Sequence, residues 1–568
     1  MKPFPAQHFR LRAALQGNRL HLHAFICLWL VSFTTKAQDT PAIAELRMQD
    51  ATLRRSLESG LRYLAERQVH ETPFQVRPSD FAMQRAHRVF GLHHLRSGLS
   101  NRLIGETHLP GAWPGFVSFI PGQGKPALQP FFMAADYSLF ITASTALCLR
   151  YLRDAEDRSH SPQIRGMKTQ ALHAVRSFRR GSSYAFWQTR TKGRYNYPRT
   201  SPPNIPVGMI TFRKRFNDRT GLWGLRRFRE ADYLTEWVRD IDDPEKNTGG
   251  PAALFNIPAD ADDSALALAL QLLLRQEGLT DTVDMEVLQV ILSYRDSART
   301  KTDRHNRGLE KDSKGILTWH KDENLPVFSK PEEGIIPFGT NNVDLVVNAN
   351  VLLAMNLAGT GQTAERQGIE QLLAGAVQNG LWKRMSIYYP ETAWFPYALS
   401  RALWYAPEAP AGIMPALPEL MREVLNMRRT YNDTACFFPA LDGNSHSLST
   451  ALLLNTLLNL GPEPARQAGL HAEYNDAVKG SLHYLVQQAK GKGAASARNS
   501  RKKKPRSCYW VSGPLFSSSV QDLAYWYSNP LTTALVVEAI SKYLLGFDLP
   551  MQQGNKRRSA VTVGSERR

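Results

Sequence analysis

The sequence predicts an all-α protein built as an (α/α)6 toroid, a barrel of six inner and six outer helices with long irregular insertions. Apolar residues recur at helical spacing in twelve segments. These segments alternate strictly between amphipathic helices with one charged face and helices that are apolar and small on most faces. Inner helices contact neighbours on all sides, whereas outer helices expose one face. An open helical solenoid gives the same alternation, but six pairs with irregular connections favour closure.

The amphipathic segments are the predicted outer helices. The first, residues 53–68, reads LRRSLESGLRYLAERQ and carries its charges at surface spacing. Residues 79–95 predict another helix, and the glycine- and proline-rich residues 101–129 predict a long loop. The remaining outer helices are predicted at residues 163–179, 282–294, 364–379, 415–428 and 472–489.

The apolar segments are the predicted inner helices, at residues 134–152, 262–275, 343–358, 392–405, 447–460 and 530–544. Each follows a turn rich in aromatic residues, proline or glycine, and each begins with polar residues. The N-termini of inner helices gather at one mouth of a toroid, so these side chains predict a ligand pocket there. Helix capping alone would also explain the polar residues. The candidate pocket residues are Asp344, Asn348, Tyr388, Tyr389, Glu391, Trp394, His446 and Asn529.

Three carboxylates lead into the second inner helix, in the run Asp260-Ala-Asp262-Asp263-Ser. Pro258 cannot continue a helix, and aspartate favours helix starts, so the cluster is predicted at a helix N-terminus. The helix dipole stabilises negative charge there. The cluster is either a strong cap or a site that handles protons.

Asp344 and Asn348 lie four residues apart, on one face of an otherwise apolar helix that also carries Asn350. Buried polar groups are costly unless they are paired. These side chains therefore either join a satisfied network between helices or line the cavity.

Two stretches resemble the repeat shared by squalene/hopene cyclases and protein prenyltransferase β-subunits. One is GLRYLAERQ at residues 60–68, and the other is GSLHYLVQQ at residues 480–488, followed by YWYSNPLTTAL at residues 525–535. The Gly-x-Trp that usually follows the glutamine is missing. The resemblance implies the α/α-toroid fold over most of residues 50–545.

The run from Asp260 to Asp263 with the following Ser-Ala is similar to the Asp-x-Asp-Asp-Thr-Ala motif of class II terpene cyclases. The middle aspartate of that motif protonates an alkene or an epoxide. The resemblance implies Asp262 as the proton donor, with Asp260 and Asp263 as modifiers or caps. A carboxylic acid does this only if its surroundings adjust its pKa, and crowding by the other two acids gives one such cause. The run Asp240-Ile-Asp242-Asp243 also matches the short pattern, but proline follows it.

The net charge of +19 is concentrated in three segments: residues 1–38 carry +5, residues 490–506 carry +8 and residues 551–568 carry +4. The body of the chain is near neutral, and no reading surface of aromatic and basic residues accompanies these runs. We therefore expect no nucleic-acid partner. The domain prediction is one toroid over residues 38–549, with an irregular basic and aromatic insertion at residues 186–250 and a basic flexible loop at residues 489–507. A disordered basic tail is predicted at residues 550–568.

The N-terminus has the pattern of a secretory signal peptide over residues 1–37. Basic residues precede a short apolar run at residues 24–33, and small residues flank a cleavage site between Ala37 and Gln38. An uncleaved anchor is the alternative. We expect a secreted or periplasmic protein with no transmembrane segment after cleavage.

Three cysteines remain beyond the predicted cleavage site, Cys148, Cys436 and Cys508, and none forms a CxxC pair. An odd, sparse set argues against a disulfide framework, although Cys436 and Cys508 could pair if the fold brings them together. Asp433, Cys436 and His446 do not have the spacing of a prenyltransferase zinc site, so we expect no metal and no cofactor.

Two other function classes fit the same fold. A secreted glycan hydrolase or lyase would place Asp262 or Asp263 opposite Asp344 or Glu391 across an aromatic cleft. A toroid that binds a ligand or a partner without catalysis is the third class. A long apolar cavity lined with aromatic rings would favour a terpenoid substrate, whereas an open groove with two acids about 5–10 Å apart would favour a glycan.

Overall fold

The computed structural model describes residues 51–68, 109–119, 132–152, 161–192, 195–198, 257–297, 299, 306, 309, 311–321, 341–408, 410–443, 445–491, 507–517 and 524–546. The chain divides into two units, Met1–Thr52 and Leu53–Arg568. The predicted signal peptide, the helix at residues 79–95, the run Asp240–Asp243 and the basic tail lie outside the described residues. So do most of the insertion at residues 186–250 and most of the basic loop.

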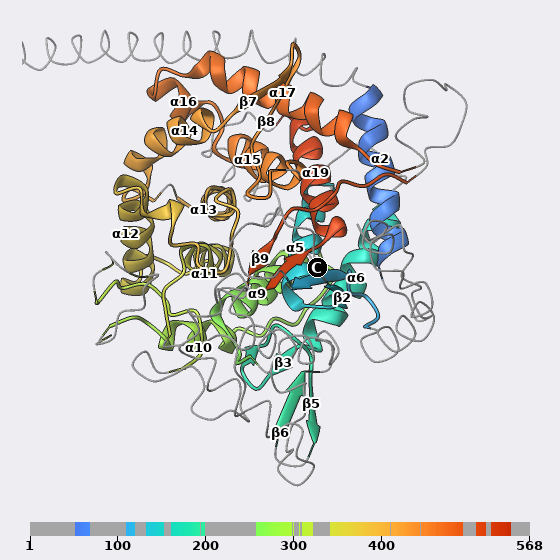
Figure 1. Ribbon diagram of the computed structural model, residues 1–568. Helices are drawn as coiled ribbons and strands as arrows, with labels where there is room; N and C mark the ends of the chain where they lie inside the picture. The colour runs from blue at the N-terminus through green and yellow to red at the C-terminus, as the bar shows by residue number, and fades with distance from the viewer. Residues whose placement is uncertain are drawn as a thin grey trace, which may run out of the picture. The chain divides into compact units, whose positions relative to one another are not determined.

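A ring of buried helices forms the centre of the second unit (Figure 1). Each of these helices packs against the next in chain order, and the last packs against the first. Almost all of their side chains are buried, which is the physical reason for their uniformly apolar sequences. In the described part of the chain this ring comprises α5 (Leu139–Cys148), α9 (Ala261–Gln276), α11 (Leu345–Ala358), α13 (Trp394–Trp404), α15 (Ser447–Leu460) and α19 (Asn529–Leu544).

Four amphipathic helices of the described residues pack against this ring. Helix α6 packs against α5 and α9, helix α10 against α9 and α11, helix α12 against α11, and helix α17 against α15. The predicted helical class is therefore confirmed. The bounds of the amphipathic helices are α2 (Ala51–Arg67), α6 (Ser161–Arg176), α10 (Glu286–Ser293), α12 (Ala364–Gln378), α14 (Leu417–Asn426) and α17 (His471–Gln488). Shorter pieces connect them, namely η3 (Leu149–Leu152), η8 (Leu381–Lys383), η9 (Met414–Ala416) and α16 (Glu463–Gln467).

A four-stranded antiparallel sheet, which the sequence analysis did not predict, joins distant parts of the chain. Its strand order is β2-β1-β10-β9, and Phe116 of β1 pairs with Tyr527 of β10. The predicted helix at residues 134–152 is wrong at its start, because residues 132–136 pair with β1 and Ser138 caps the helix that follows. The strands are β1 (Gly115–Phe119), β2 (Phe132–Asp136), β9 (Phe516–Ser517) and β10 (Ala524–Tyr527).

Three small hairpins complete the described strands. They are β3 (Arg179–Arg180) with β4 (Ser183–Tyr184), β5 (Thr189–Lys192) with β6 (Tyr195–Pro198), and β7 (Arg429–Asn432) with β8 (Ala435–Phe437). The start of the predicted irregular insertion is thus a hairpin. The outer helix predicted at residues 282–294 begins only at Glu286, because the residues before it make other polar contacts. Thr280 accepts a hydrogen bond from Arg176 at the end of α6, and Asp284 accepts one from Arg179 of β3.

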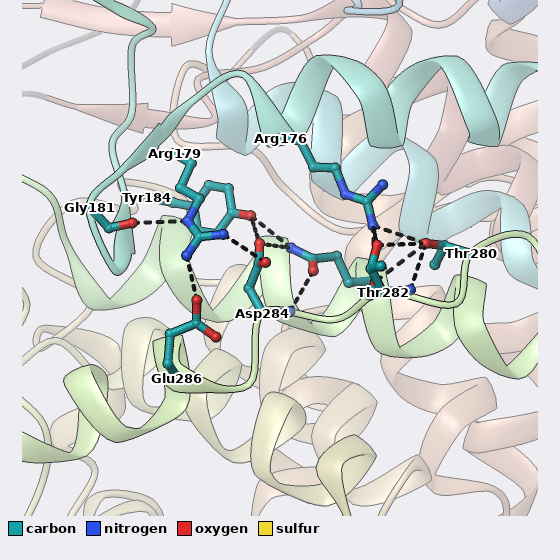
Figure 2. A network of polar contacts seen from close by, with 9 residues as sticks. Arg176, Arg179, Gly181, Tyr184, Thr280, Thr282, Asp284 and Glu286 are labelled. Carbon is teal, nitrogen blue, oxygen red and sulfur yellow. Dashed lines mark hydrogen bonds and ion pairs between the residues drawn. The ribbon is translucent and has the colours of Figure 1, made fainter.

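A polar network fixes the position of helix α9 (Figure 2). Tyr184 of β4 bonds Asp284 through its hydroxyl group and accepts a 2.8 Å hydrogen bond from Gln271 of α9. Arg179 of β3 donates to Asp284 at 2.9 Å and also pairs with Glu286. The hairpin and the loop before α10 therefore hold α9 from its middle, which places its acidic N-terminus.

Candidate functional site

A pocket opens at the N-terminus of α9. Its empty volume is about 630 Å³, a figure that includes open solvent at the mouth of the pocket. Eight of its described lining residues carry aromatic rings, and three are the aspartates of the acidic run. The lining residues are Phe140, Phe186, Trp187, Ile257, Asp260, Asp262, Asp263, Thr318, Trp319, Val347, Tyr388, Tyr389, Phe516, Ser517 and Trp526.

The aromatic rings of the pocket hold one another in place. Phe140 of α5 packs edge-on against Phe516 of β9, with ring centroids 5.2 Å apart. Phe516 in turn stacks on Trp526 of β10 at 4.9 Å, and Phe186 packs edge-on against Trp187 at 4.9 Å. These are the separations at which aromatic pairs attract beyond simple burial. The pocket wall is therefore preformed and apolar.

Asp262 is held by two hydrogen-bond donors. Asn350 of α11 donates its amide Nδ2 to Oδ1 at 2.7 Å, and the hydroxyl group of Tyr389 bonds Oδ2. Burial raises the pKa of Asp262, while these two hydrogen bonds and the charge of Arg401 act in the opposite direction. Burial is the larger effect, so the neutral acid is favoured relative to an aspartate in water.

Asp260 and Asp263 form a second acidic pair in the same wall. Asp260 caps α9, because its Oδ1 accepts a 2.7 Å hydrogen bond from the backbone N–H of Asp263. Burial and the charge of Asp262 raise the pKa of Asp260 to about 7. The pKa of Asp263 lies well above its usual range because of burial, the two neighbouring charges and its hydrogen bond to Asp260. Asp260 thus caps the helix, and burial favours the neutral form of all three acids.

Two buried polar atoms in this wall have no hydrogen-bond partner among the described residues, Oδ1 of Asp263 and Nε1 of Trp526. Oδ1 of Asp263 is buried without a hydrogen bond, although the side chain lines the pocket. Such groups are rare in folded proteins and are usually completed by a ligand or a water molecule. The unpartnered oxygen of Asp263 can accept a hydrogen bond from a water molecule or from a polar group of a ligand.

Of the other predicted site residues, Tyr388 and Tyr389 line the pocket, whereas Asp344 and Asn348 do not. Oδ1 of Asp344 caps α11 by accepting from Val346 N, and Asp344 Oδ2 accepts from Tyr388 N at 3.1 Å. Burial raises the pKa of Asp344 to about 7.

Asn348 fastens a loop to helix α11. Its side chain accepts a hydrogen bond from Ile316 N at 2.7 Å and donates one to Ile316 O at 3.0 Å. The same loop continues through Thr318 and Trp319, which line the pocket. The amide therefore belongs to a satisfied network between elements.

The remaining four predicted residues also lie outside the described lining. Glu391 accepts hydrogen bonds from Leu441 N and the Ser449 hydroxyl group, each at 2.9 Å, and burial raises its pKa to about 7. Trp394 packs behind the wall, against Phe140 and Tyr389.

His446 does not cap α15 with its side chain, because its Nδ1 instead accepts a 3.0 Å hydrogen bond from Ala440 N. Oδ1 of Asn529 accepts a hydrogen bond from Ser512 N at 2.8 Å. Both side chains thus join loops to the ring of buried helices.

A further buried carboxyl group stands behind the aromatic wall. Asp136 at the end of β2 is fully buried and accepts a 2.6 Å hydrogen bond from the indole Nε1 of Trp187. Burial raises its pKa to about 7. Asp136 therefore fixes the ring of Trp187, which lines the pocket.

The sequence analysis missed most of the aromatic wall. Trp319 comes from an irregular loop, and Phe516 and Trp526 come from strands β9 and β10. The aromatic run before the last inner helix was noticed, but its pairing with β1 was not. Nothing in the local sequence shows that these rings face the aspartates.

Metal-binding groups, cysteines and membrane-spanning helices add no second candidate site among the described residues. They contain no group of three or more histidine, cysteine, aspartate or glutamate side chains arranged to hold a metal ion. Their cysteines Cys148, Cys436 and Cys508 are free and buried. Helices long and apolar enough to cross a membrane are absent from the described part of the chain.

Comparison with known proteins gives distant likenesses to solved structures. No family model matches the chain, and no curated protein matches it. Two solved structures of variants of the type II terpene cyclase MstE from Scytonema are similar, one without ligand and one in complex with geranylgeranyl dihydroxybenzoate. Each is 11% identical in sequence, with a TM-score of 0.42, over 87% of this chain and 97% of the other.

Proposed function

We propose that the pocket is an acid-catalysis site, in which Asp262 protonates an alkene or an epoxide of an isoprenoid-type substrate and so starts a cyclisation. One observation carries this proposal: three buried carboxyl groups stand in the wall of a pocket that is otherwise almost entirely aromatic and apolar. Such a wall binds hydrocarbon, and the acids supply the polar step.

The groups around Asp262 are suited to the transfer of its proton to an alkene. The O–H bond of Asp262 breaks, and the two electrons of the alkene π bond form the new C–H bond, which leaves a carbocation and a carboxylate. The carboxylate keeps its two donors, Asn350 and Tyr389. The faces of the surrounding aromatic rings attract positive charge, so both products of the step are stabilised where they form.

A glycan substrate is less well supported. Hydrolysis of a glycosidic bond needs a second carboxylate across the cleft. The two predicted for that role, Asp344 and Glu391, accept backbone hydrogen bonds and do not line the described pocket. A site that only binds an apolar ligand would account for the aromatic wall, but it assigns no role to the three aspartates that line it.

Two further proposals concern the arrangement of the helices and the location of the protein. We propose that the ring of buried helices and its outer helices form the (α/α)6 toroid expected from the sequence. The packing of α19 against α5 supports this. We also propose that the chain is exported, on the basis of the signal-like composition of residues 1–37.

The test compares wild type with Asp262→Asn on two substrate panels, polyprenyl compounds with terminal alkenes or epoxides, and oligosaccharides. We expect wild type to cyclise a polyprenyl compound, and the variant to lose about 10²–10⁴-fold in rate, the usual contribution of a general acid. Asp476→Asn, on the exposed face of α17, is the matched control and should keep full activity.

Full cyclase activity in Asp262→Asn would contradict the proposal. Activity on oligosaccharides alone would favour the glycan class. Binding of a polyprenyl compound without turnover, unchanged in the variant, would favour a binding protein.

A further inference from the structure

A chain of hydrogen bonds leads from Asp262 across two neighbouring helices. Asn350 of α11 donates from Nδ2 to Asp262 Oδ1 at 2.7 Å, and Arg401 of α13 donates from Nη2 to Asn350 Oδ1 at 2.9 Å. All three side chains are at least 90% buried. Neither Asn350 nor Arg401 lines the pocket.

The hydrogen-bonding capacities of these three side chains fix which atom donates and which accepts in each hydrogen bond. A guanidinium group donates hydrogen bonds and accepts none. The atom of Asn350 that faces Arg401 must therefore be the carbonyl oxygen, and the atom that faces Asp262 must be the amide nitrogen. That nitrogen can only donate, so Oδ1 of Asp262 must accept on this side. The orientation of an asparagine amide is usually ambiguous, and here Arg401 resolves it.

Tyr389 contacts the other carboxyl oxygen of Asp262. Its hydroxyl group bonds Oδ2 of Asp262 and, unlike an amide nitrogen or a guanidinium, can either donate or accept. The acidic proton of Asp262 can therefore reside on Oδ2 while both neighbours stay satisfied. A proton on Oδ1 that pointed towards Asn350 would face the amide Nδ2, which is itself a donor, and no hydrogen bond could form there.

We propose that Arg401 is a positioning residue, which acts through Asn350 to keep Oδ1 of Asp262 an acceptor and so confines the acidic proton to Oδ2. This proposal rests on the proposed function, in which Asp262 is the acid. It adds a residue from a helix that contributes nothing to the described pocket lining.

Arg401 is itself well anchored. Its guanidinium lies over the ring of Tyr397, 5.0 Å from the centroid. The Tyr397 hydroxyl group donates to Glu538 at 2.8 Å, and Glu538 pairs with Lys542 at 2.6 Å. Lys542 donates to Asn459 at 2.6 Å. Helices α13, α15 and α19 thus hold the guanidinium in one orientation, as a positioning role requires.

The same chain does not serve as a proton relay. Proton relays run through groups that accept and release protons easily, such as carboxyl, imidazole, hydroxyl and water. An amide does neither near neutral pH, and a guanidinium keeps its proton. The contribution of Arg401 is therefore geometric and electrostatic.

Several charged or titratable groups act on Asp262 together with Arg401. Its neighbours on α9 affect its pKa, as do groups on α11, on the loop before α13 and on α13 itself. They are Asp260, Asp263, Asp344, Tyr389 and Arg401.

The test follows the titration of Asp262 by infrared or NMR spectroscopy of the intact protein labelled with ¹³C at the aspartate carboxyl carbons, without substrate. The signal that disappears in Asp262→Asn identifies the residue. In Arg401→Met, we expect the titration midpoint to rise by about one pH unit, a tenfold change in the equilibrium, because the positive charge and the fixed donor are both lost. Asn350→Leu should raise it in the same direction. Arg401→Lys, which still only donates, should stay closer to wild type.

Arg366→Met is the matched control, because Arg366 is equally buried but pairs with Glu370 on α12. It should leave the midpoint of Asp262 unchanged. If Arg401→Met does not fold, Asn350→Leu still decides the question. An unchanged midpoint in Asn350→Leu would overturn the proposal, as would an unchanged midpoint in a folded Arg401→Met or an equal shift in Arg366→Met.

The titration is measured without substrate, so its result does not depend on whether the protein has cyclase activity. If Asp262→Asn keeps cyclase activity while the midpoint still moves in Arg401→Met, the acid assignment fails and the positioning geometry does not. In an active enzyme, Arg401→Met should lower kcat and leave KM nearly unchanged, since Arg401 does not touch the substrate.

Discussion

At the scale of single residues, Tyr389 bonds Oδ2 of Asp262, the oxygen that carries the acidic proton in the proposed mechanism. Burial and the charge of Asp262 raise the pKa of the phenol well above its usual range, so Tyr389 stays protonated and can donate to the carboxylate. This hydrogen bond favours the ionised form of Asp262 and lowers its pKa.

We expect Tyr389→Phe to raise the pKa of Asp262, because the ionised form loses a donor. The alkaline limb of the kcat–pH profile should move up by about one pH unit, while the maximal rate falls. Tyr474→Phe removes a different buried hydroxyl group, which donates to Leu457 O at 3.2 Å, and should leave the limb in place. A limb that stays fixed or moves down in Tyr389→Phe would refute this role.

The sequence predicted the residues of the site unevenly. Asp260, Asp262 and Asp263 could be found because a proline and a capping pattern place them together. Arg401 could not, because it lies in the last turn of a buried helix and its relation to Asp262 depends on how α13 packs beside α11. Local patterns reveal which residues share a helix end, but not which side chains meet across helices.

At the scale of elements, close helix packing explains the two glycines that open the stretches resembling the cyclase repeat. A Cβ atom on Gly60 of α2 would lie 2.8 Å from Val537 of α19. On Gly480 of α17 it would lie 2.6 Å from the sulfur of Cys436 and 3.1 Å from its backbone nitrogen. Both glycines let a helix approach a neighbour more closely than any other residue would.

We expect Gly480→Ala to lower the free energy of unfolding by about 1–3 kcal/mol, since the added methyl group overpacks the contact with β8. Gly375→Ala in α12 is the matched control, because nothing lies within 4 Å of its Cβ position. It should raise the free energy of unfolding by roughly 0.5–1 kcal/mol through helix propensity. Urea denaturation measures both changes, and a neutral Gly480→Ala would argue against this close approach.

Helices were predictable from the sequence to a degree that strands were not. The buried helix at residues 447–460 was predicted with its observed bounds. Strands β1 and β10 were not predicted, because their residues pair across more than 400 positions of chain and neither strand exceeds five residues. A 3.6-residue period is a local signal, whereas strand pairing depends on a distant partner.

At the scale of the whole molecule, the alternation of apolar and amphipathic segments was enough to predict the helical class and which of the described helices are buried. The pocket was less predictable, because its wall combines that ring with the sheet and with the loop that carries Trp319. The same arrangement buries many carboxyl groups. Burial raises the pKa values of Asp136, Asp260, Asp344 and Glu391 to about 7 each.

These groups make the stability of the protein depend on pH in a defined direction. Each pKa is higher in the folded state than in the unfolded state, where aspartate titrates near 3.9 and glutamate near 4.3. The folded state therefore binds more protons between about pH 4 and pH 7. The stabilisation is complete below the unfolded pKa and is lost as the pH rises through about 7. Each group contributes a slope of about 1.4 kcal/mol per pH unit in that window.

Asp136→Asn tests this dependence on one group. An asparagine oxygen can still accept the hydrogen bond from Trp187, and the amide does not titrate. Between pH 5 and pH 7, we expect the free energy of unfolding of the variant to fall less steeply than that of wild type, by about 1.4 kcal/mol per pH unit. Urea denaturation at pH 5, 6 and 7 measures the slopes, with Asp476→Asn as the exposed control. Parallel slopes in wild type and Asp136→Asn would show that Asp136 is already ionised at pH 5 in the folded protein.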